Sequence, residues 1–174
     1  MNRDESFESF VDNHTDSLLV TAYLMTHDRS SAEELVQDTM VALYSRWNRV
    51  MQADSLLAYV RRSLLNRYLN QKRAKSSTEY VTAEVPDGVV FVDFSTRVDD
   101  QDALSRALRR LPPRQRAALV LRFFHDLPDK DAAETLGCRV GTLRSLVSRA
   151  LATLRLDPSL SIDIDNGSRK VVES

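Results

Sequence analysis

The side chains of this chain that could bind a ligand are mainly cations, which bind anions, and they are concentrated in two segments. Residues 56–75 carry six cations and no acid: Arg61, Arg62, Arg67, Lys72, Arg73 and Lys75. Tyr59, Asn66, Tyr68 and Asn70 are interleaved with them, and such side chains stack on and hydrogen-bond to unpaired bases. Phosphate contacts would release counterions and make the binding salt-dependent. The segment predicts a nucleic-acid contact. The alternative is a solvated basic face with two core tyrosines, the better interpretation for Tyr59 taken alone.

Residues 129–148 fit a helix-turn-helix, the second candidate site. Ala133 is small where the two helices would cross, and Gly137 tolerates the positive φ of the turn. On a helical wheel one side holds Val140, Leu143, Val147, Ala150, Leu151 and Leu154; Thr142, Ser145, Ser148 and Arg149 lie opposite, with Arg139 and Arg144 on the flanks. Such a helix suits a major groove, where arginine reads guanine with two hydrogen bonds. A plain helix corner is the alternative. Five arginines favour DNA: Arg122, Arg139, Arg144, Arg149 and Arg155.

The elements that position the first site are three amphipathic helices. Apolar residues recur at helical spacing from Phe7 to Tyr23, and the pattern breaks at His27. Ser30 to Glu34 predicts a capping-box start for a second helix, with Val36, Met40, Leu43, Tyr44 and Trp47 inward. A third helix begins near Asp54 and Ser55 and runs to the basic end. Together these predict a helical bundle over residues 5–75.

The rest of the chain predicts a linker, a second helical domain and a tail. Residues 76–101 are acidic and lack helical period, so we expect a flexible linker, with the run from Val89 to Val92 as an apolar anchor. In residues 102–156, a short helix from Leu104 to Leu111 stops at Pro112, and Pro113 opens the next helix, which runs to about His125. Residues 157–174 read as a polar tail. The predicted class is all-α, with two small helical domains.

Composition argues against several other classes of protein. Cys138 is the only cysteine among 174 residues, which excludes an internal disulfide framework and suits the cytoplasm. No apolar run approaches the length of about 18 to 20 residues that spans a membrane. His14, His27 and His125 are far apart and show no metal-ligand spacing. Glu33-Glu34 and the cluster Asp126, Asp129 and Asp131 lie at helix starts, where acids are stabilised. We therefore expect no enzyme, metal or cofactor.

In this order the motifs resemble a known family, the extracytoplasmic-function (group IV) sigma factors of bacterial RNA polymerase, nearest the actinobacterial SigE-like group. Leu35-Val36-Gln37-Asp38, preceded by Ala32-Glu33-Glu34, is similar to their region 2.2, which grips the β′ clamp helices. Ala58-Tyr59-Val60-Arg61-Arg62, Asn66 and Lys72-Arg73 resemble regions 2.3–2.4, which open the −10 element. Leu111 to Arg116 and Gly137 to Ser145 resemble region 4, which reads the −35 element. The resemblance covers about residues 7–73 and 103–155.

The resemblance implies roles and partners. It implies core RNA polymerase (β′ clamp helices and β flap) and promoter DNA, double-stranded at −35 and single-stranded at −10, with an anti-sigma factor as a candidate partner and no membrane. The implied polymerase contacts are Glu34, Leu35, Gln37 and Asp38. The implied −10 contacts are Tyr59, Arg62, Asn66, Arg67, Asn70, Lys72 and Arg73. The implied −35 contacts are Arg122, Arg139, Thr142, Arg144, Ser145, Ser148 and Arg149.

Three departures and two rival functions accompany the resemblance. Leu146 stands where the family often has Arg or Gln, and Asn70 where it often has Asp. Pro128 replaces the usual serine cap, so we expect Asp129 to cap the helix that follows.

A stand-alone helix-turn-helix regulator that does not bind polymerase is the main rival, and a pure protein-interaction module is another. The segment from Leu35 to Asp38 discriminates the main rival, because only a sigma factor needs it for polymerase.

Overall fold

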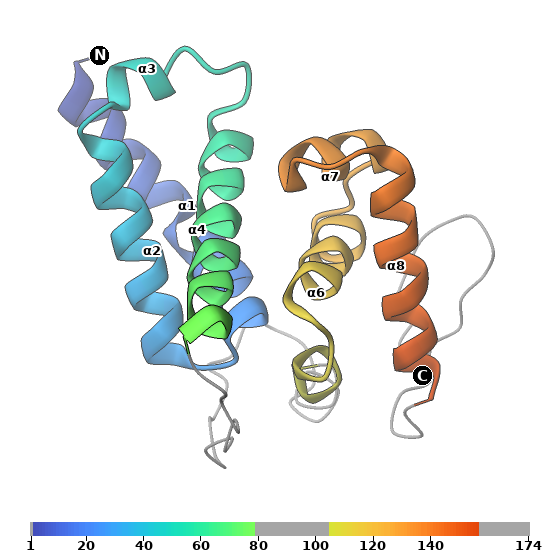
Figure 1. Ribbon diagram of the computed structural model, residues 1–174. Helices are drawn as coiled ribbons and strands as arrows, with labels where there is room; N and C mark the ends of the chain where they lie inside the picture. The colour runs from blue at the N-terminus through green and yellow to red at the C-terminus, as the bar shows by residue number, and fades with distance from the viewer. Residues whose placement is uncertain (1, 79–104, 157–174) are drawn as a thin grey trace. The chain divides into compact units, whose positions relative to one another are not determined.

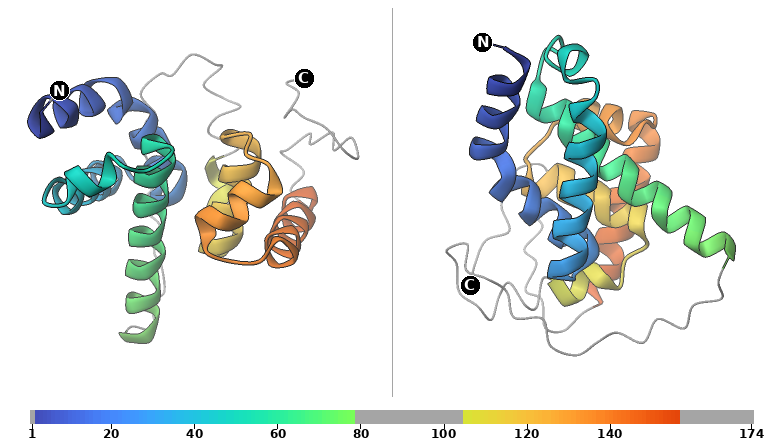
Figure 2. Two further views of the ribbon diagram at one scale, coloured as in Figure 1. Left: turned by 90° about the horizontal axis from the view of Figure 1, so that it is seen from above. Right: turned by 90° about the vertical axis from the view of Figure 1, so that its left-hand side faces the viewer.

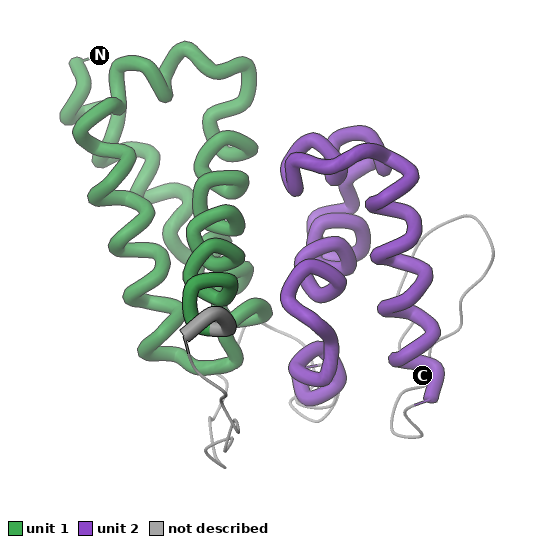
Figure 3. The backbone as a smooth tube through the Cα atoms, viewed as in Figure 1, with its two compact units in different colours: residues 1–87 green, residues 88–174 purple. Residues whose placement is uncertain are grey.

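The computed structural model describes residues 2–78 and 105–156, and all regular secondary structure within them is helical (Figure 1). The chain divides into two compact units, residues 1–87 and 88–174 (Figure 3). The predicted all-α class with two small helical domains is confirmed. The anchor from Val89 to Val92 and the tail predicted over residues 157–174 lie outside the described residues, as does most of the predicted linker. Its first residues, 76–78, instead continue a helix.

The described part of the first unit, residues 2–78, contains the helices α1 (Arg3–Thr26), α2 (Arg29–Tyr44), α3 (Trp47–Val50) and α4 (Leu56–Thr78). α1 packs against α2 and α4, and α2 also packs against α4. The core between them is apolar, as the periodicity of the sequence predicts. Its largest fully buried side chains are Leu18, Met25, Leu43, Trp47, Leu64 and Leu65.

The start of α2 differs from the predicted capping box. His27 ends α1 in the left-handed conformation (φ 58°), and Asp28 follows with extended backbone as the N-cap of α2. The Asp28 carboxylate accepts hydrogen bonds from the Ser31 backbone N–H at 2.8 Å and the Ser31 hydroxyl at 2.6 Å. The box predicted from Ser30 to Glu34 is therefore wrong. The turn at His27 places an aspartate directly before the helix, and that residue takes the cap.

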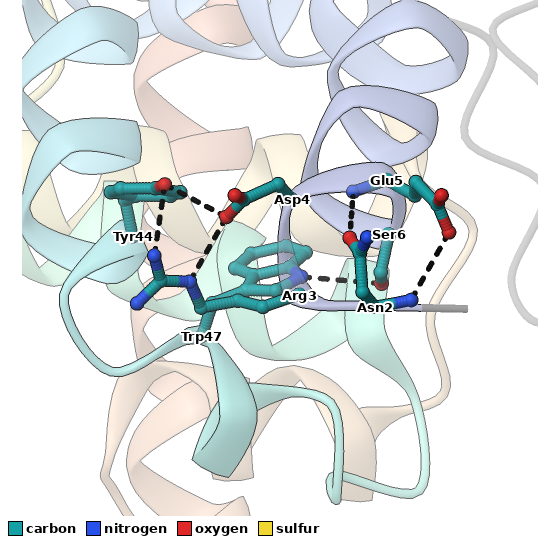
Figure 4. Close-up of polar contacts among 7 residues, drawn as sticks. All are labelled: Asn2, Arg3, Asp4, Glu5, Ser6, Tyr44 and Trp47. Carbon is teal, nitrogen blue, oxygen red and sulfur yellow. Dashed lines mark hydrogen bonds and ion pairs between the residues drawn. The ribbon is translucent and has the colours of Figure 1, made fainter.

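Trp47 lies in its own short helix, α3, and not on α2 as its spacing suggested. Its ring contacts Phe7 and Phe10 edge-on, at centroid distances of 5.0 and 5.3 Å. The indole N–H donates to the Ser6 hydroxyl at 3.2 Å (Figure 4). Because Phe7, Phe10 and Ser6 all belong to α1, these contacts fasten the start of α1 to the turn after α2.

A polar contact beside this aromatic cluster joins α1 to the end of α2. The Tyr44 hydroxyl donates to Asp4 at 2.9 Å and accepts from Arg3 at 3.1 Å (Figure 4). The hydrogen bond from Tyr44, and then the one from Arg3, lower the pKa of the Asp4 carboxyl from its usual value. Asp4 also lies in the first turn of α1, where a negative charge is favoured.

The second unit carries the predicted helix-turn-helix. Residues 105–109 are helical, followed by α6 (Pro113–Leu119), η1 (Val120–Phe124), α7 (Asp129–Leu136) and α8 (Val140–Arg155). Pro113 opens α6 as predicted. The helix does extend to Phe124, but its last five residues form a π-helical turn, which the apolar pattern did not indicate. α6 packs against α7 and α8, which also pack on each other.

One buried cation joins the first helix of this unit to α6. Arg116 is 7% exposed. Its guanidinium donates to the backbone carbonyls of Leu108 at 2.8 Å, Leu111 at 3.0 Å and Arg109 at 3.3 Å. These carbonyls belong to the end of the helix over residues 105–109 and to the turn after it, where few backbone donors remain; the Leu108 carbonyl also accepts from the Leu111 N–H at 3.1 Å. Arg116 therefore satisfies the helix end and sets the position of α6 behind the helix-turn-helix.

Candidate nucleic-acid interface

The turn between α7 and α8 has the geometry that the sequence predicts. Ala133 is 2% exposed, and Gly137 has a left-handed φ of 66°. The Gly137 N–H donates to the Glu134 carbonyl at 3.1 Å, and the Cys138 N–H to the Ala133 carbonyl at 3.0 Å. This pair of bonds is the Schellman motif that ends a helix on a glycine. It turns the chain so that α8 follows α7 across a corner.

The exposed side of α8 is a strip of small side chains bordered by larger ones. Leu143, Ala150 and Leu154 are buried, and Val140, Val147 and Leu151 are half-buried, which confirms the predicted inner side. At 100° per residue, the strip runs along the middle of the opposite side, with Thr142 and Arg149 at one border and Arg144 and Arg155 at the other. The strip consists of Gly141, Ser145, Ser148 and Ala152, all exposed.

This strip can approach another surface closely. A Cβ atom placed on Gly141 would meet nothing within 4 Å. Leu146, which departs from the family pattern, is half-buried. Arg139 is exposed at the N-cap of α8, with extended backbone. A helix with a smooth centre and arginines on its borders has the shape and chemistry that a major groove accepts.

Asp129 does not cap α7, so the prediction for this residue is wrong. Pro128 holds the N-cap position without a side-chain bond, and Asp129 is the first residue of the helix. Its carboxylate instead binds two arginines, with Oδ1 2.6 Å from Nε of Arg122 and Oδ2 2.9 Å from Nε of Arg144. Two cations within reach are stronger partners for a carboxylate than a backbone N–H.

Arg122 lies between the helix-turn-helix and the segment before it. Its side chain is 28% exposed, and besides Asp129 it donates to the backbone carbonyl of Leu127. The guanidinium also lies 6.0 Å from the ring centroid of Phe123. Of the implied −35 residues, Arg122 is thus the one that is not exposed, and it is bound within the unit on two sides. The other six are all exposed: Arg139, Thr142, Arg144, Ser145, Ser148 and Arg149.

The basic helix predicted at residues 56–75 is the long helix α4. Val60, Leu64, Leu65, Tyr68 and Leu69 are buried, whereas residues 70–75 are all exposed. The end of α4 runs beyond α1 and α2 (Figure 2). The cations at this end of the helix are therefore exposed at the surface, where a long ligand could contact them.

Five of the seven implied −10 residues share one face of α4. Tyr59, Arg62, Asn66, Asn70 and Arg73 follow one another at steps of three and four residues, which places them in one row along the helix. Tyr59 and Asn66 are half-buried and the other three are exposed.

The remaining cations of α4 lie off this row. Lys72 is on the side of Tyr68, with its ammonium 5.7 Å from that ring centroid. Half-buried Arg67 lies on a flank. Arg61 is also half-buried, and its burial lowers the pKa of the guanidinium from its usual value. The sequence count of six cations thus overstates the charge that the row itself presents.

A third exposed face lies on α2. Glu34, Gln37 and Asp38 are exposed, and Val41, one turn beyond, is 74% exposed. These four positions follow the spacing of a single helix face. Leu35 is 3% exposed and belongs to the core, so its side chain is not on the surface that the sequence assigned to it. The sequence analysis missed Val41, although a valine at this spacing among three polar residues was visible.

The described ranges, 2–78 and 105–156, contain neither a cluster of metal-binding side chains nor a helix that could cross a membrane. No group of three or more His, Cys, Asp and Glu side chains in these ranges is arranged to hold a metal ion. No helix there combines the length and the apolar character needed to cross a bilayer.

Two family models match this chain, in the order of its two units. Residues 10–78 match Sigma-70 region 2, and residues 101–154 match Sigma-70, region 4. The RNA polymerase sigma-E factor of Streptomyces avermitilis is 34% identical over 86% of this chain and 83% of its own length. That of Streptomyces coelicolor is 32% identical over 86% of this chain and 84% of its own. The chain belongs to the sigma-70 family of RNA polymerase sigma factors, in the extracytoplasmic-function group.

A solved structure supports the same assignment. The sigma factor RpoE of Bartonella quintana, crystallised in complex with the anti-sigma factor NepR, superimposes with a TM-score of 0.74 at 26% identity. The match covers 92% of this chain and 99% of that one. Membership of a sigma-factor family therefore argues against the rival interpretation, a stand-alone helix-turn-helix regulator that does not bind polymerase.

Proposed function

We propose that the chain binds core RNA polymerase and directs transcription from specific promoters by opening the −10 element and reading the −35 element. Residues 5–75 would form region 2 and residues 102–156 region 4, joined by a linker over residues 76–101. The observation that carries this proposal is the presence of three exposed faces of different chemistry, on α2, α4 and α8. In this function the chain catalyses no reaction of its own and works in the cytoplasm, where polymerase and promoters are.

The face of α2 is assigned to polymerase because of its mixed chemistry. Glu34 and Asp38 supply negative charge, which would repel DNA, so this face suits a protein. Among the described residues of the first unit, Val41 is the most exposed large apolar side chain, and its neighbours on this face are polar. An apolar centre with a polar rim is the usual composition of a protein interface. Leu35 would support this face from within the core.

The row on α4 is assigned to the −10 element. Tyr59 offers a ring, Asn66 and Asn70 offer amides, and Arg62 and Arg73 offer guanidinium groups along one line. Stacking and amide bonding recognise bases whose Watson–Crick edges are open, and the cations hold the backbone. Lys72, beside Tyr68 and off the row, would contact phosphate from the other side. The row therefore suits a melted strand better than a duplex.

The strip on α8 is assigned to the −35 duplex. Its small side chains let the helix enter the major groove, and Thr142, Ser145 and Ser148 offer hydroxyls to base edges or phosphates. Arg144 and Arg149 lie on opposite borders, where they would reach bases or backbone on either side of the groove.

In vitro transcription with core polymerase on genomic fragments tests the proposal as a whole. Promoter-specific transcripts that require the chain are the expected result. The α2 face is tested by measuring how much of the chain binds to core polymerase, and Asp38→Arg should abolish this binding. Asp12→Arg is the matched control, since it makes the same charge reversal at an exposed position of α1, and it should leave core binding unchanged. If Asp38→Arg together with Gln37→Ala leaves core binding intact, the polymerase assignment of this face is wrong.

A second experiment separates the two DNA contacts. Replacing Lys72 and Arg73 with alanine should reduce promoter opening, read by permanganate footprinting, more than it reduces binding to closed duplex. Arg149→Ala should do the reverse, weakening duplex binding by about 1 to 3 kcal/mol if Arg149 reads a base edge. Unchanged footprints in the double variant would contradict the −10 assignment.

An anti-sigma factor is a candidate partner as well. The Bartonella relative was solved bound to one. For this chain, a protein that covers the α2 face would compete with polymerase, and a competition assay with core polymerase would detect it.

A further inference from the structure

We propose that Asp129 is a positioning residue that sets the sequence specificity of α8 by orienting Arg144 for guanine recognition. The inference rests on the proposed reading of the −35 duplex by α8. It concerns a residue for which the sequence predicts only a structural role at the start of a helix.

The geometry at Arg144 leaves its outer edge available. Asp129 Oδ2 is bonded to Nε of Arg144 at 2.9 Å, on the inner side of the guanidinium. Within the described residues the two terminal amino groups have no bond, and the side chain is 69% exposed. Those two groups form the fork that arginine uses to bind O6 and N7 of guanine together. Asp129 therefore fixes the plane of the guanidinium while leaving the reading edge open.

Asp129 is itself held in place from behind. Its other carboxylate oxygen lies 2.6 Å from Nε of Arg122, and Arg122 is bound in turn to the Leu127 carbonyl. Both Asp129 and Arg122 are half-buried, at 30% and 28% side-chain exposure. Asp129 also begins α7, where the helix dipole favours a negative charge. The chain of contacts from Leu127 through Arg122 and Asp129 to Arg144 is therefore fixed at its inner end.

A fixed arginine favours specific binding over non-specific binding for two reasons. Arg144 loses less side-chain freedom on binding guanine, a saving that corresponds to about a threefold to tenfold gain in affinity for the correct base pair. The carboxylate also offsets part of the charge of Arg144 toward any phosphate, so that sequence-independent binding gains less from this arginine. Removing Asp129 should thus lower discrimination without abolishing DNA binding.

The experiment uses the full chain bound to core polymerase. A pool of duplexes with a randomised −35 segment is selected, and the selected duplex becomes the probe. Binding is then compared between the probe and duplexes in which each G·C pair is replaced by A·T. We expect Arg144→Ala to lose discrimination at one G·C pair, and Asp129→Asn to lose about threefold to tenfold at the same pair. Asp131→Asn is the matched control, since Asp131 lies in the same first turn and makes no ion pair with a described residue.

The outcomes separate this inference from the proposed function. In the Arg144→Ala background, Asp129→Asn should have no further effect on discrimination, because a positioning residue acts only through its partner. The inference is wrong if Asp129→Asn discriminates between base pairs as well as the wild type does. It is also wrong if Asp129→Asn lowers discrimination equally in the wild-type and the Arg144→Ala backgrounds. Either result leaves the −35 assignment intact. If the wild-type complex selects no sequence, or Arg144→Ala discriminates like the wild type, the reading by Arg144 fails and the inference fails with it. Circular dichroism of each variant excludes unfolding as the cause.

Discussion

Replacing Arg116 with methionine should destabilise the second unit alone. Arg116 is 7% exposed and donates to three backbone carbonyls, those of Leu108, Leu111 and Arg109. A hydrogen bond to a charged group contributes about 1.5 to 3 kcal/mol, and the three bonds share one side chain, so their sum is not additive. We expect a loss of about 3 to 5 kcal/mol, because the carbonyls of Leu111 and Arg109 lose the guanidinium donor and the carbonyl of Leu108 keeps only the Leu111 N–H. A domain of about 50 residues has a total stability of only about 3 to 8 kcal/mol.

The two units can be followed separately in one sample. Trp47 is the only tryptophan of the chain, and it is fully buried in the first unit. Its fluorescence therefore reports unfolding of that unit, whereas far-ultraviolet circular dichroism reports both. In urea titrations of Arg116→Met, part of the dichroism should be lost at low urea while the fluorescence midpoint stays unchanged. DNA binding by α8 should fall in parallel, since α6 supports both α7 and α8.

Arg114→Met is the matched control for this prediction. Arg114 is on the same helix, two residues earlier, and is half-buried. The same loss of charge there should leave both transitions near their wild-type midpoints. If the two variants behave alike, the carbonyl bonds of Arg116 contribute little, and the argument from buried acceptors is refuted.

The remaining predictions concern a cap, a turn and the smooth strip of α8. Asp28→Ala should cost about 1 kcal/mol in the first unit, measured from Trp47 fluorescence in urea. Ser31 lowers the pKa of Asp28, through its hydroxyl first and its N–H second, so the cap's contribution is complete above about pH 4 and is lost as pH falls through the folded pKa. Gly137→Ala, at a φ of 66°, should destabilise the second unit by about 1 kcal/mol in circular dichroism melts. Gly141→Trp should keep the fold but weaken duplex binding at least about tenfold, because the indole occupies the strip.

Each of these has an outcome that contradicts it. A wild-type urea midpoint for Asp28→Ala at neutral pH, or an equal acid dependence in wild type and variant, would show that the cap bond is not formed. An unchanged melt for Gly137→Ala would mean that the turn does not require the left-handed conformation. Gly141→Ala is the control for the strip, since a single methyl has open space. Normal duplex binding by Gly141→Trp would place the DNA on another face.

Several local features of this protein were determined by its sequence alone. The inner side of α8, the opening of α6 at Pro113 and the turn at Gly137 were all predicted correctly. Each depends on interactions between residues a few positions apart: side chains three and four apart share a helix face, proline suits the first turn, and glycine accepts a positive φ. The order of the motifs along the chain was likewise sufficient to indicate the family, since it needs no knowledge of packing.

Only the tertiary structure decided how side chains with more than one option are used. Asp129 could cap a helix or bind a cation, and the sequence does not show that Arg122 and Arg144 lie within 3 Å of it. Leu35 fits a surface motif by position, but the packing of α2 against α1 and α4 buries it and leaves Val41 exposed. Arg116 reads as one more cation until the end of the preceding helix supplies acceptors for it. Such choices depend on partners distant in sequence, whose proximity is created by the fold.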